Sequence, residues 1–468
     1  MPANADRIIA LATPPGSGAI ALFRLSGRGV IEEVDKYFKP RKGSGLTGTP
    51  SHRLRFGEMI DGEEVIDEVL VSVFRAPHSY TGEDMVEISC HASPYVQERI
   101  LKLFLAVGFR LARPGEFSMR AFLNGKMDLT RAEAVADLIA AENRLQHRAA
   151  MHQLRGGFVR DIKRLRDRLV EFTALMELEL DFAEEDVEFA NREDLKKALN
   201  EIRAQIRELT DSFAEGNVIK HGVAVSIVGA PNTGKSTLLN ALLNEEKAIV
   251  TDIPGTTRDA IEDSVHIDGI RFRFIDTAGI RHTHDRVERL GIERTFGKIG
   301  EARIVLWMID AQKAGEQIPE MKAHLDDIRR KHPGKPVFVL LNKIDLVRPG
   351  QVEELTGKLR ALKADEVIPL SAKQKTGIDR LKQALTAHFR SQRLDQGQTV
   401  ITNVRHYQAL RSALQALDEV EAGLQAGLSS DLIAVDLRDV LNRLGEITGE
   451  ITTDDLLTHI FQNFCIGK

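Results

Sequence analysis

The chain has few cysteines and no long apolar run. Its 468 residues include only Cys90 and Cys465, which lie far apart, so a disulfide framework is excluded and a reducing compartment is favoured. No stretch reaches the apolar length of a membrane span. The first residues form neither a basic start nor an apolar core, so we expect no secretion signal. These absences predict a soluble cytoplasmic protein with no membrane partner.

The chain also lacks an excess of positive charge. A formal net charge of -5 argues against a broadly basic surface for nucleic acid, although a local basic patch stays open. The length exceeds what one hydrophobic core normally holds, so two or three domains are expected.

A phosphate-binding loop is present in the middle of the chain. The segment Gly229-Ala-Pro-Asn-Thr-Gly-Lys-Ser236 follows the apolar run 223–228 and precedes a helical pattern at 238–243. In this strand–loop–helix setting, backbone N–H groups can surround the phosphates. Lys235 can reach the outer phosphates, and the Ser236 hydroxyl can bind Mg²⁺.

Three further segments follow in the order that a guanine-nucleotide hydrolase requires. They are Asp276-Thr277-Ala278-Gly279, Asn342-Lys343-Ile344-Asp345 and Ser371-Ala372-Lys373. The first would hold the metal shell and sense the γ-phosphate. The carboxylate of the second can accept both N1–H and the 2-amino group of guanine, a donor pair that adenine lacks. The third would support the base. The four segments together predict GTP binding and hydrolysis.

The residue after Gly279 is unusual for this class. Switch GTPases of the Ras type carry a Gln there to orient the attacking water, whereas this chain has Ile280. Hydrolysis is therefore either very slow or assisted by other groups.

The periodicity of the flanking regions predicts their structure. Short apolar runs and one helix up to about residue 117 indicate an α/β region, with strands at 8–13, 19–25, 64–73 and 85–89 and the helix at 95–107. Long amphipathic helices are expected at 129–154, 158–180, 193–213, 407–424 and 431–444. The acidic stretch 181–186 is interpreted as a solvated helix end.

The fold class is therefore multidomain α/β plus all-α. We expect an N-terminal α/β domain at 1–118, a helical domain at 119–216, an inserted Ras-like P-loop GTPase domain at 217–390, and the rest of the helical bundle at 391–468. The two helical pieces should pack together, because each amphipathic face needs a partner.

Motifs outside the GTPase segment carry a resemblance that covers essentially the whole chain. They are Ala12-Thr-Pro-Pro-Gly16, Arg24-Leu-Ser-Gly27, Tyr80-Thr-Gly-Glu-Asp84, Arg113-Pro-Gly-Glu-Phe-Ser118, Ala121-Phe-Leu-Asn-Gly-Lys126 and Phe464-Cys-Ile-Gly-Lys468. In combination they resemble the tRNA-modification GTPase family called MnmE or TrmE. One departure is His91-Ala-Ser93, where the family usually has His-Gly-Gly.

The resemblance implies a function and partners. Members of the family add an aminomethyl or carboxymethylaminomethyl group at C5 of the wobble uridine of certain tRNAs, together with the FAD-containing protein MnmG (GidA). A tetrahydrofolate derivative, 5,10-methylene- or 5-formyl-tetrahydrofolate, supplies the one-carbon unit. The N-terminal domain binds the folate and forms the homodimer.

The resemblance also implies a potassium ion at the phosphates. From the residues alone, Asn232 could equally stabilise its own loop. By resemblance it binds K⁺ together with Thr251, Ile253 and Thr256 of the segment 251–259, and Thr257 binds Mg²⁺. A monovalent cation there can offset transition-state charge as an arginine finger does. Hydrolysis would then depend on switch closure and on dimerisation of the GTPase domains. The residues expected to bind GTP or its ions are Asn232, Thr233, Gly234, Lys235, Ser236, Thr237, Thr251, Ile253, Thr256, Thr257, Asp276, Thr277, Ala278, Gly279, Asn342, Lys343, Asp345, Ser371, Ala372 and Lys373.

Further roles follow the same resemblance. Glu288, by itself an ordinary solvated carboxylate, becomes the group that orients water in place of the missing Gln. Arg24, Glu83, Lys126 and Lys468 become folate-binding residues, although as a bare pattern the first three would be surface ion pairs. Cys465 is either an idle thiol or a thiolate that attacks the uridine ring.

Two other classes of protein stay open from the sequence. A ribosome-assembly GTPase of the Era or Der type would explain 229–373 but not 1–117 or 464–468. A dynamin-like membrane GTPase would need a lipid-binding patch, and none is recognisable. The sequence contains no known RNA-binding module, and basic helical stretches such as 163–168 are equally well explained as solvated faces.

Overall fold

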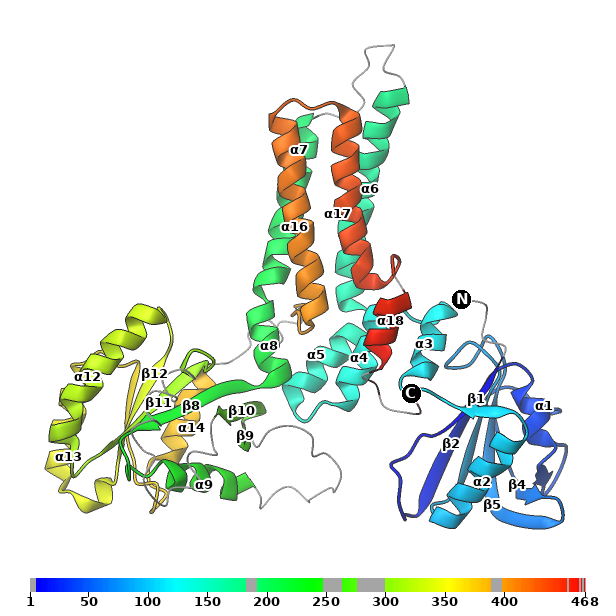
Figure 1. Cartoon of the computed structure of the whole chain (residues 1–468), viewed down its shortest axis with the longest axis horizontal. Coiled ribbons are helices and arrows are strands. Elements are labelled where there is room, and N and C mark those ends of the chain that lie inside the picture. Colours follow the sequence, from blue (N-terminus) through cyan, green and yellow to red (C-terminus); the bar gives the residue numbers. More distant parts are fainter. Residues whose placement is uncertain are drawn as a thin grey trace. The chain divides into compact units, whose positions relative to one another are not determined.

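The structure, a computed structural model, describes residues 6–181, 192–246, 263–275, 299–388, 398–452, 454–462, 464 and 467. The chain forms two compact units. The first comprises Met1–Ala140, Ala150–Arg207 and Gln408–Lys468, and the second comprises Ala141–Ala149 and Glu208–Tyr407. The second unit is thus interposed in the sequence of the first (Figure 1).

A seven-stranded sheet begins the first unit, in the order β3-β4-β5-β6-β2-β1-β7. All its strand pairs are antiparallel except that of β1 with β7. Helix α2 packs on one face, and its Ile100 and Phe104 are fully buried with Phe23 and Ile88 of the sheet. The α/β prediction for this region is confirmed. The elements are β1 Arg7–Leu11, β2 Ile20–Ser26, α1 Val30–Asp35, β3 Phe38–Pro40, β4 Arg53–Asp61, β5 Glu64–Phe74, β6 Met85–His91, α2 Pro94–Ala106 and β7 Phe109–Leu111.

Helices make up the rest of the first unit. Figure 1 shows the long helices α6, α7, α16 and α17 running side by side. Ion pairs join them, such as Arg168 to Glu201 at 2.7 Å between α6 and α7. The helices that lie wholly or partly in this unit are α3 Glu116–Leu123, α4 Leu129–Ile139, α5 Arg144–Leu154, α6 Gly157–Asp181, α7 Arg192–Asp211, α16 Val404–Gln425, α17 Ser430–Thr448 and α18 Asp454–Phe461. One end of each of α5, α7 and α16 belongs to the second unit.

Two helix predictions were wrong in detail. The single helix expected at 129–154 is broken into α4 and α5, because Asn143 caps a new helix by accepting a hydrogen bond from the backbone N–H of Gln146 at 2.9 Å. The helix expected at 193–213 ends at Asp211, and α8 (Phe213–His221) follows. At the break, the Ser212 hydroxyl donates to Leu209 O and accepts from Ile401 N. Of the acidic stretch 181–186, only Asp181 lies within the described residues.

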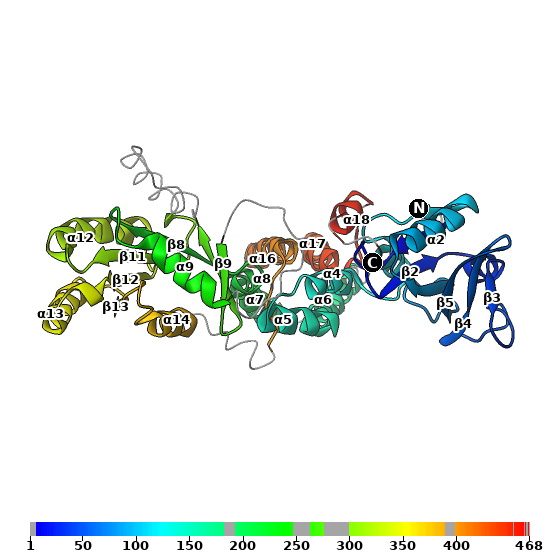
Figure 2. The ribbon, with the colours of Figure 1, turned by 90° about the horizontal axis from the view of Figure 1, so that it is seen from below.

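The second unit contains a six-stranded sheet in the order β13-β12-β11-β8-β10-β9, parallel except for the β9–β10 pair. Apolar clusters line both faces, so the central strands are apolar throughout, as parallel sheets require. Figure 2 shows this unit from below. Its further elements are β8 Val223–Gly229, α9 Lys235–Glu246, β9 Asp263–Ile267, β10 Ile270–Ile275, β11 Ile304–Asp310, α12 Ala314–Lys331, β12 Val337–Asn342, η2 Ile344–Leu346, α13 Pro349–Arg360, β13 Glu366–Pro369 and α14 Ile378–Ala387.

Across the described parts of the chain, every helix is too short or too polar to cross a bilayer.

Candidate functional site

The phosphate loop lies between β8 and α9, as predicted. Its backbone takes conformations that favour glycine: φ is +149° at Gly229 and +101° at Gly234, and Asn232 is left-handed at +61°. A Cβ atom on Gly229 would lie 2.4 Å from Met308 O of the neighbouring strand β11. Glycine is therefore required where the loop leaves the sheet, and the turn brings the loop N–H groups together at the start of α9.

Lys235 is the first residue of α9 and lies over the loop. Its ammonium group donates to Gly229 O at 2.9 Å and to Ala230 O at 3.0 Å. Thr233 is fully buried beneath the loop, and its hydroxyl donates to Ala230 O at 2.9 Å. The Lys235 cation and the positive end of α9 thus converge on one small region, where phosphate oxygens are favoured.

Asn342, the last residue of β12, joins the phosphate loop to the base-reading loops. Its side-chain amide donates to Thr233 O at 2.7 Å, and its side-chain oxygen accepts from Ala372 N at 3.0 Å. A single buried side chain therefore sets the spacing between the segments predicted to hold the phosphates and the base.

Lys343 makes a second connection between the same loops. The residue is left-handed, with φ +63°, and its ammonium donates to Asn232 O and to a carboxylate oxygen of Asp310, both at 2.7 Å. Asp310 is 4% exposed and was missed by the sequence analysis. Asp310 ends the apolar run that forms strand β11, just as Asn342 ends the apolar run that forms β12. This sequence pattern could have identified Asp310.

Asp345 is the residue expected to bind the guanine base. Its Oδ1 atom is buried and accepts no hydrogen bond from any residue that the structure describes. Buried carboxylate oxygens normally have donors, because losing them costs about 1–3 kcal/mol. An acceptor left open beside the phosphate loop suits a ligand with paired N–H donors, as guanine has.

The predicted base-supporting loop is closed by its own hydrogen bonds. Ser371 N donates to Thr376 O at 2.9 Å, and the Ser371 hydroxyl accepts from Gln374 N at 3.2 Å. Ser371 and Ala372 are buried, while Lys373 is exposed. The structure thus brings the segments 229–236, 342–345 and 371–373 to one edge of the sheet.

Several predicted site residues lie outside the described residues. They are Thr251, Ile253, Thr256, Thr257, Asp276, Thr277, Ala278, Gly279, Glu288, Cys465 and Lys468, together with Ile280. Their roles stay predictions.

A second candidate site is a cavity of about 420 Å³ in the N-terminal sheet region, and Arg24 and Lys126 both line it. Arg24 donates to Glu87 Oε1 from Nε at 2.9 Å and from Nη2 at 2.7 Å. Its guanidinium also lies 5.3 Å from the centre of the Tyr80 ring. Glu87, which faces Arg24 across the β2–β6 pair and also lines the cavity, was missed by the sequence analysis.

Glu83 is engaged elsewhere. Its carboxylate accepts from the buried guanidinium of Arg120 at 3.1 Å and from the Ser26 hydroxyl at 2.8 Å, and it does not line the cavity that Arg24 and Lys126 share. Lys126 donates to Pro77 O at 2.9 Å.

Gly467, near the end of the chain, contacts a residue that lines this cavity. Arg24 Nη1 donates to Gly467 O at 3.2 Å, and a Cβ on Gly467 would lie 3.0 Å from Ala12 Cα. Cys90, by contrast, is buried in β6, and burial, with a smaller contribution from Asp67, raises the pKa of its thiol to about 12. Cys90 is therefore an unreactive core thiol at neutral pH.

The phosphate loop, the asparagine bridge and the open Asp345 oxygen define a P-loop protein that binds guanine nucleotide. Comparison with known proteins gives the family. Residues 129–465 match the MnmE helical domain, and residues 7–126 match the GTP-binding protein TrmE N-terminus. The chain belongs to the MnmE family.

Relatives support this assignment along the whole length. The tRNA modification GTPase MnmE of Christiangramia forsetii is 51% identical, covering 99% of each chain. That of Flavobacterium johnsoniae is also 51% identical, and that of Bacteroides fragilis is 50% identical, both covering 99% of this chain and all of their own. The protein is thus a GTP-hydrolysing enzyme, and the predicted fold class is confirmed.

Among solved structures, the G-domain of FeoB from Methanococcus jannaschii is 26% identical and covers 36% of this chain and 98% of its own. Its TM-score of 0.26 is too low to bear on the fold.

Proposed function

We propose that the protein uses GTP hydrolysis to drive modification of the wobble uridine of certain tRNAs, together with a flavoprotein of the MnmG (GidA) type. It would add an aminomethyl or carboxymethylaminomethyl group at C5. The observation that carries this proposal is the full-length similarity to enzymes named tRNA modification GTPase MnmE, combined with a guanine-nucleotide site and a separate cationic cavity in one chain.

Mass analysis of wobble uridine in tRNA from cells that lack the protein tests this function. Loss of the aminomethyl series, restored by the wild-type gene, is the expected result. Unaltered tRNA together with defective ribosomal subunits would instead favour the ribosome-assembly class.

The proposed arrangement keeps the boundaries expected from the sequence: 1–118 for folate binding and homodimerisation, 119–216 and 391–468 for the helical domain, and 217–390 for the GTPase domain. The cytoplasm is the proposed compartment. Mg²⁺ would be held by Ser236 and Thr257. K⁺ would be held by Asn232, Thr251, Ile253 and Thr256, and the exposure of Asn232 on the loop supports this role.

We expect hydrolysis to depend on the monovalent cation. Replacing K⁺ by Na⁺ at constant ionic strength should slow GTP turnover about tenfold or more, because the smaller ion fits carbonyl ligands set for K⁺ less well and offsets less transition-state charge. Single-turnover hydrolysis in the two salts measures this, with GDP affinity as the control. Equal rates would remove the potassium site.

We expect Glu288→Ala to lower the hydrolysis rate about tenfold or more while GTP affinity changes less than about twofold, because a group that orients water acts in the transition state and not in binding. Glu316→Ala is the matched control, since Glu316 lies in the first turn of α12. A near-normal rate in Glu288→Ala would refute the assigned role.

The cavity lined by Arg24 and Lys126 is proposed to bind the tetrahydrofolate derivative, with Glu83 and Lys468 contributing. A carboxylate-bearing ligand suits the two cations, and the ring of Tyr80 suits a flat heterocycle. The contact between Arg24 and Gly467 supports placing Cys465 near the one-carbon unit.

We expect Cys465→Ser to abolish tRNA modification while folate binding and GTP turnover persist, because a serine hydroxyl is a far poorer nucleophile than a thiolate at neutral pH. Quantifying modified uridine after reaction with the flavoprotein measures this, with Cys90→Ser as the comparison for loss of a buried thiol. Full modification by Cys465→Ser would exclude a required thiolate.

A further inference from the structure

The second unit contains a large cavity at the edge of its sheet opposite to the nucleotide site. The cavity, of about 1000 Å³, is lined by residues at the amino ends of the parallel strands, including Gly222 before β8, Arg303 before β11 and Lys335 before β12, and by α8. Gly229, Asp310 and Asn342 of the nucleotide site end these same strands. The two sites are thus separated by the length of a seven-residue strand, roughly 20 Å.

Cations predominate among the charged residues that line the cavity. Arg271, Arg273, Arg303, Lys331 and Lys335 contribute positive charge, and Asp211, Glu215 and Glu301 contribute negative charge. His221, His332 and His388 also line it. Residues in or next to strands β8, β10, β11 and β12 and helix α8 line the cavity, and these elements are labelled in Figure 1.

Part of this positive charge is already neutralised. Arg271 donates to Glu142 at 2.9 Å, and Lys331 pairs with Asp327 at 2.7 Å. Neither pair leaves its cation wholly available to a ligand.

Two neighbouring cations, Lys335 and Arg303, form no ion pair with a carboxylate of the described residues. Lys335 donates to the backbone carbonyls of Ile299 and Gly300, and no carboxylate oxygen of the described residues lies within ion-pair distance of it. Arg303 is exposed, and its guanidinium has no hydrogen bond or ion pair within the described ranges. Burial and, next, repulsion by Arg303 lower the pKa of Lys335. Glu301 also lines the cavity but forms no ion pair with either.

The chemistry of the lining points to phosphate groups. Arginine binds phosphate oxygens in pairs, and lysine adds a point charge, so one phosphate could contact both Arg303 and Lys335 and relieve their repulsion. Among the described residues that line the cavity there is no Phe, Tyr or Trp, so they offer no platform on which a base could stack. This combination is typical of contacts to a nucleic-acid backbone and not of a pocket for a free nucleotide.

We propose that this cavity is a second phosphate-binding site, in which Arg303 and Lys335 hold backbone phosphates of the tRNA substrate. The inference rests on the proposed function for the identity of the RNA. It assigns to the GTPase-bearing unit a direct contact with tRNA, at the edge of the sheet opposite to GTP.

Binding of labelled tRNA to the full-length protein at several salt concentrations tests this site. Arg303→Glu should weaken binding about tenfold, and it should reduce the slope of log K against log salt by about 1, as expected for one lost phosphate contact. Lys335→Gln should act in the same direction. Arg360→Glu is the matched control, because Arg360 is an exposed arginine that ends α13 and does not line the cavity. The guanine-nucleotide affinity and the thermal unfolding temperature of each variant are measured to check that it is folded.

Inorganic tripolyphosphate separates the two sources of phosphate. If tripolyphosphate competes with tRNA for the wild-type protein but not for Arg303→Glu, the proposed site is supported. If Arg303→Glu loses tripolyphosphate binding but keeps the wild-type affinity for tRNA, the assignment of RNA as the ligand is overturned. Equal weakening of tRNA binding by Arg303→Glu and Arg360→Glu would overturn the site, because it would reflect overall charge alone.

Parallel measurement of wobble uridine separates this inference from the proposed function. Normal modification by the wild-type protein, with unchanged tRNA affinity in Arg303→Glu, would reject the cavity and leave the function standing. If the wild-type protein binds tRNA through Arg303 but takes part in no modification, the proposed function is rejected and the phosphate site stands.

Discussion

Asp345→Asn is expected to weaken GDP and GTP binding about 100-fold or more and to shift preference towards xanthine nucleotides. The buried Oδ1 atom has no donor among the described residues, so it is available to a base. Losing two hydrogen bonds to a carboxylate, each worth about 1.5–3 kcal/mol, removes at least about 3 kcal/mol of binding. Xanthine has an oxygen in place of the 2-amino group, and the new amide can donate to it.

Titration with fluorescent guanine and xanthine nucleotides measures this preference. Asp379→Asn is the control, because Asp379 is an exposed carboxylate in the first turn of α14 and should leave both affinities unchanged. Retained guanine affinity in Asp345→Asn would mean that the open oxygen does not read the base.

Gly234→Ala is expected to reduce nucleotide affinity more than about 100-fold. The added methyl would lie 2.3 Å from the Asn342 amide nitrogen, and φ at Gly234 is +101°, which L-residues rarely adopt. Asn342 would have to move, and the bonds to Thr233 O and Ala372 N that join the phosphate and base loops would be lost. Together these losses cost about 3 kcal/mol or more.

Gly315→Ala is the matched control for this change. Gly315 lies in α12 with open space where a Cβ would be, so alanine should leave affinity unchanged and slightly stabilise the helix. Calorimetric titration with GDP and thermal unfolding of both variants provide the comparison. Normal GDP affinity in Gly234→Ala would show that the loops are not coupled through Asn342.

The elements of the nucleotide site were largely predictable from sequence. Apolar runs at 223–228 and 337–341 each end in a polar motif, and both correspond to strands β8 and β12. Parallel strands bring their carboxyl ends to one edge of a sheet, so the motifs had to meet there. Asp310 follows the same rule but belongs to none of the four motifs, and it was therefore missed.

The helical region was predictable in its periodicity but not in its breaks. Helix α6 and helix α17 lie where amphipathic patterns indicated. The breaks after Ile139 and Asp211 depend on single side chains, Asn143 and Ser212, that bond to backbone groups. For Ser212 the partner is Ile401, about 190 positions away in the chain, which no local pattern contains.

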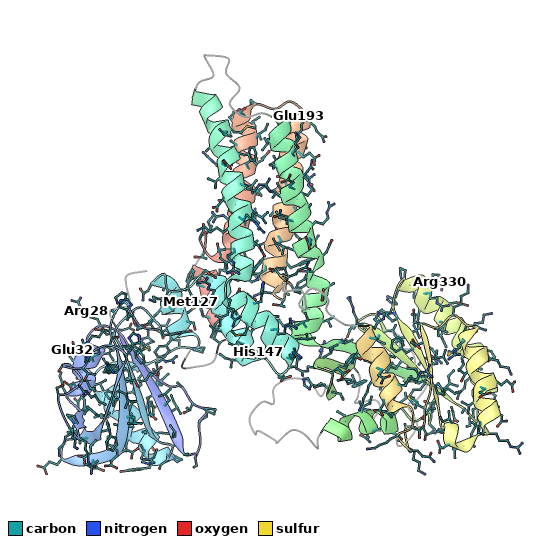
Figure 3. The ribbon with its side chains drawn as sticks, turned by 180° about the vertical axis from the view of Figure 1, so that it is seen from behind. Arg28, Glu32, Met127, His147, Glu193 and Arg330 are labelled. Atoms are coloured by element: carbon teal, nitrogen blue, oxygen red, sulfur yellow. The ribbon has the colours of Figure 1, made fainter. Side chains whose placement is uncertain are left out.

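Figure 3 shows the side chains of the described residues and labels His147 and Arg330 among them. His147 lies in α5, within the amphipathic pattern 129–154 that predicted a helix, and Arg330 lies in α12. Whether a charged residue on such an element is solvated or lines a cavity, as the neighbouring Lys331 does, depends on which other segments pack beside it.

The sequence by itself determined the nucleotide class, the family and the alternation of α/β and helical regions, because these depend on short motifs and on periodicity along the chain. The tertiary structure alone decided that Glu87 and not Glu83 shares a cavity with Arg24. It also decided that, among the described residues, no donor reaches Asp345 Oδ1 and no carboxylate pairs with Arg303 or Lys335, which line one cavity. The physical reason is that charge pairing and desolvation depend on distances between residues remote in the chain, and those distances exist only once the chain has folded.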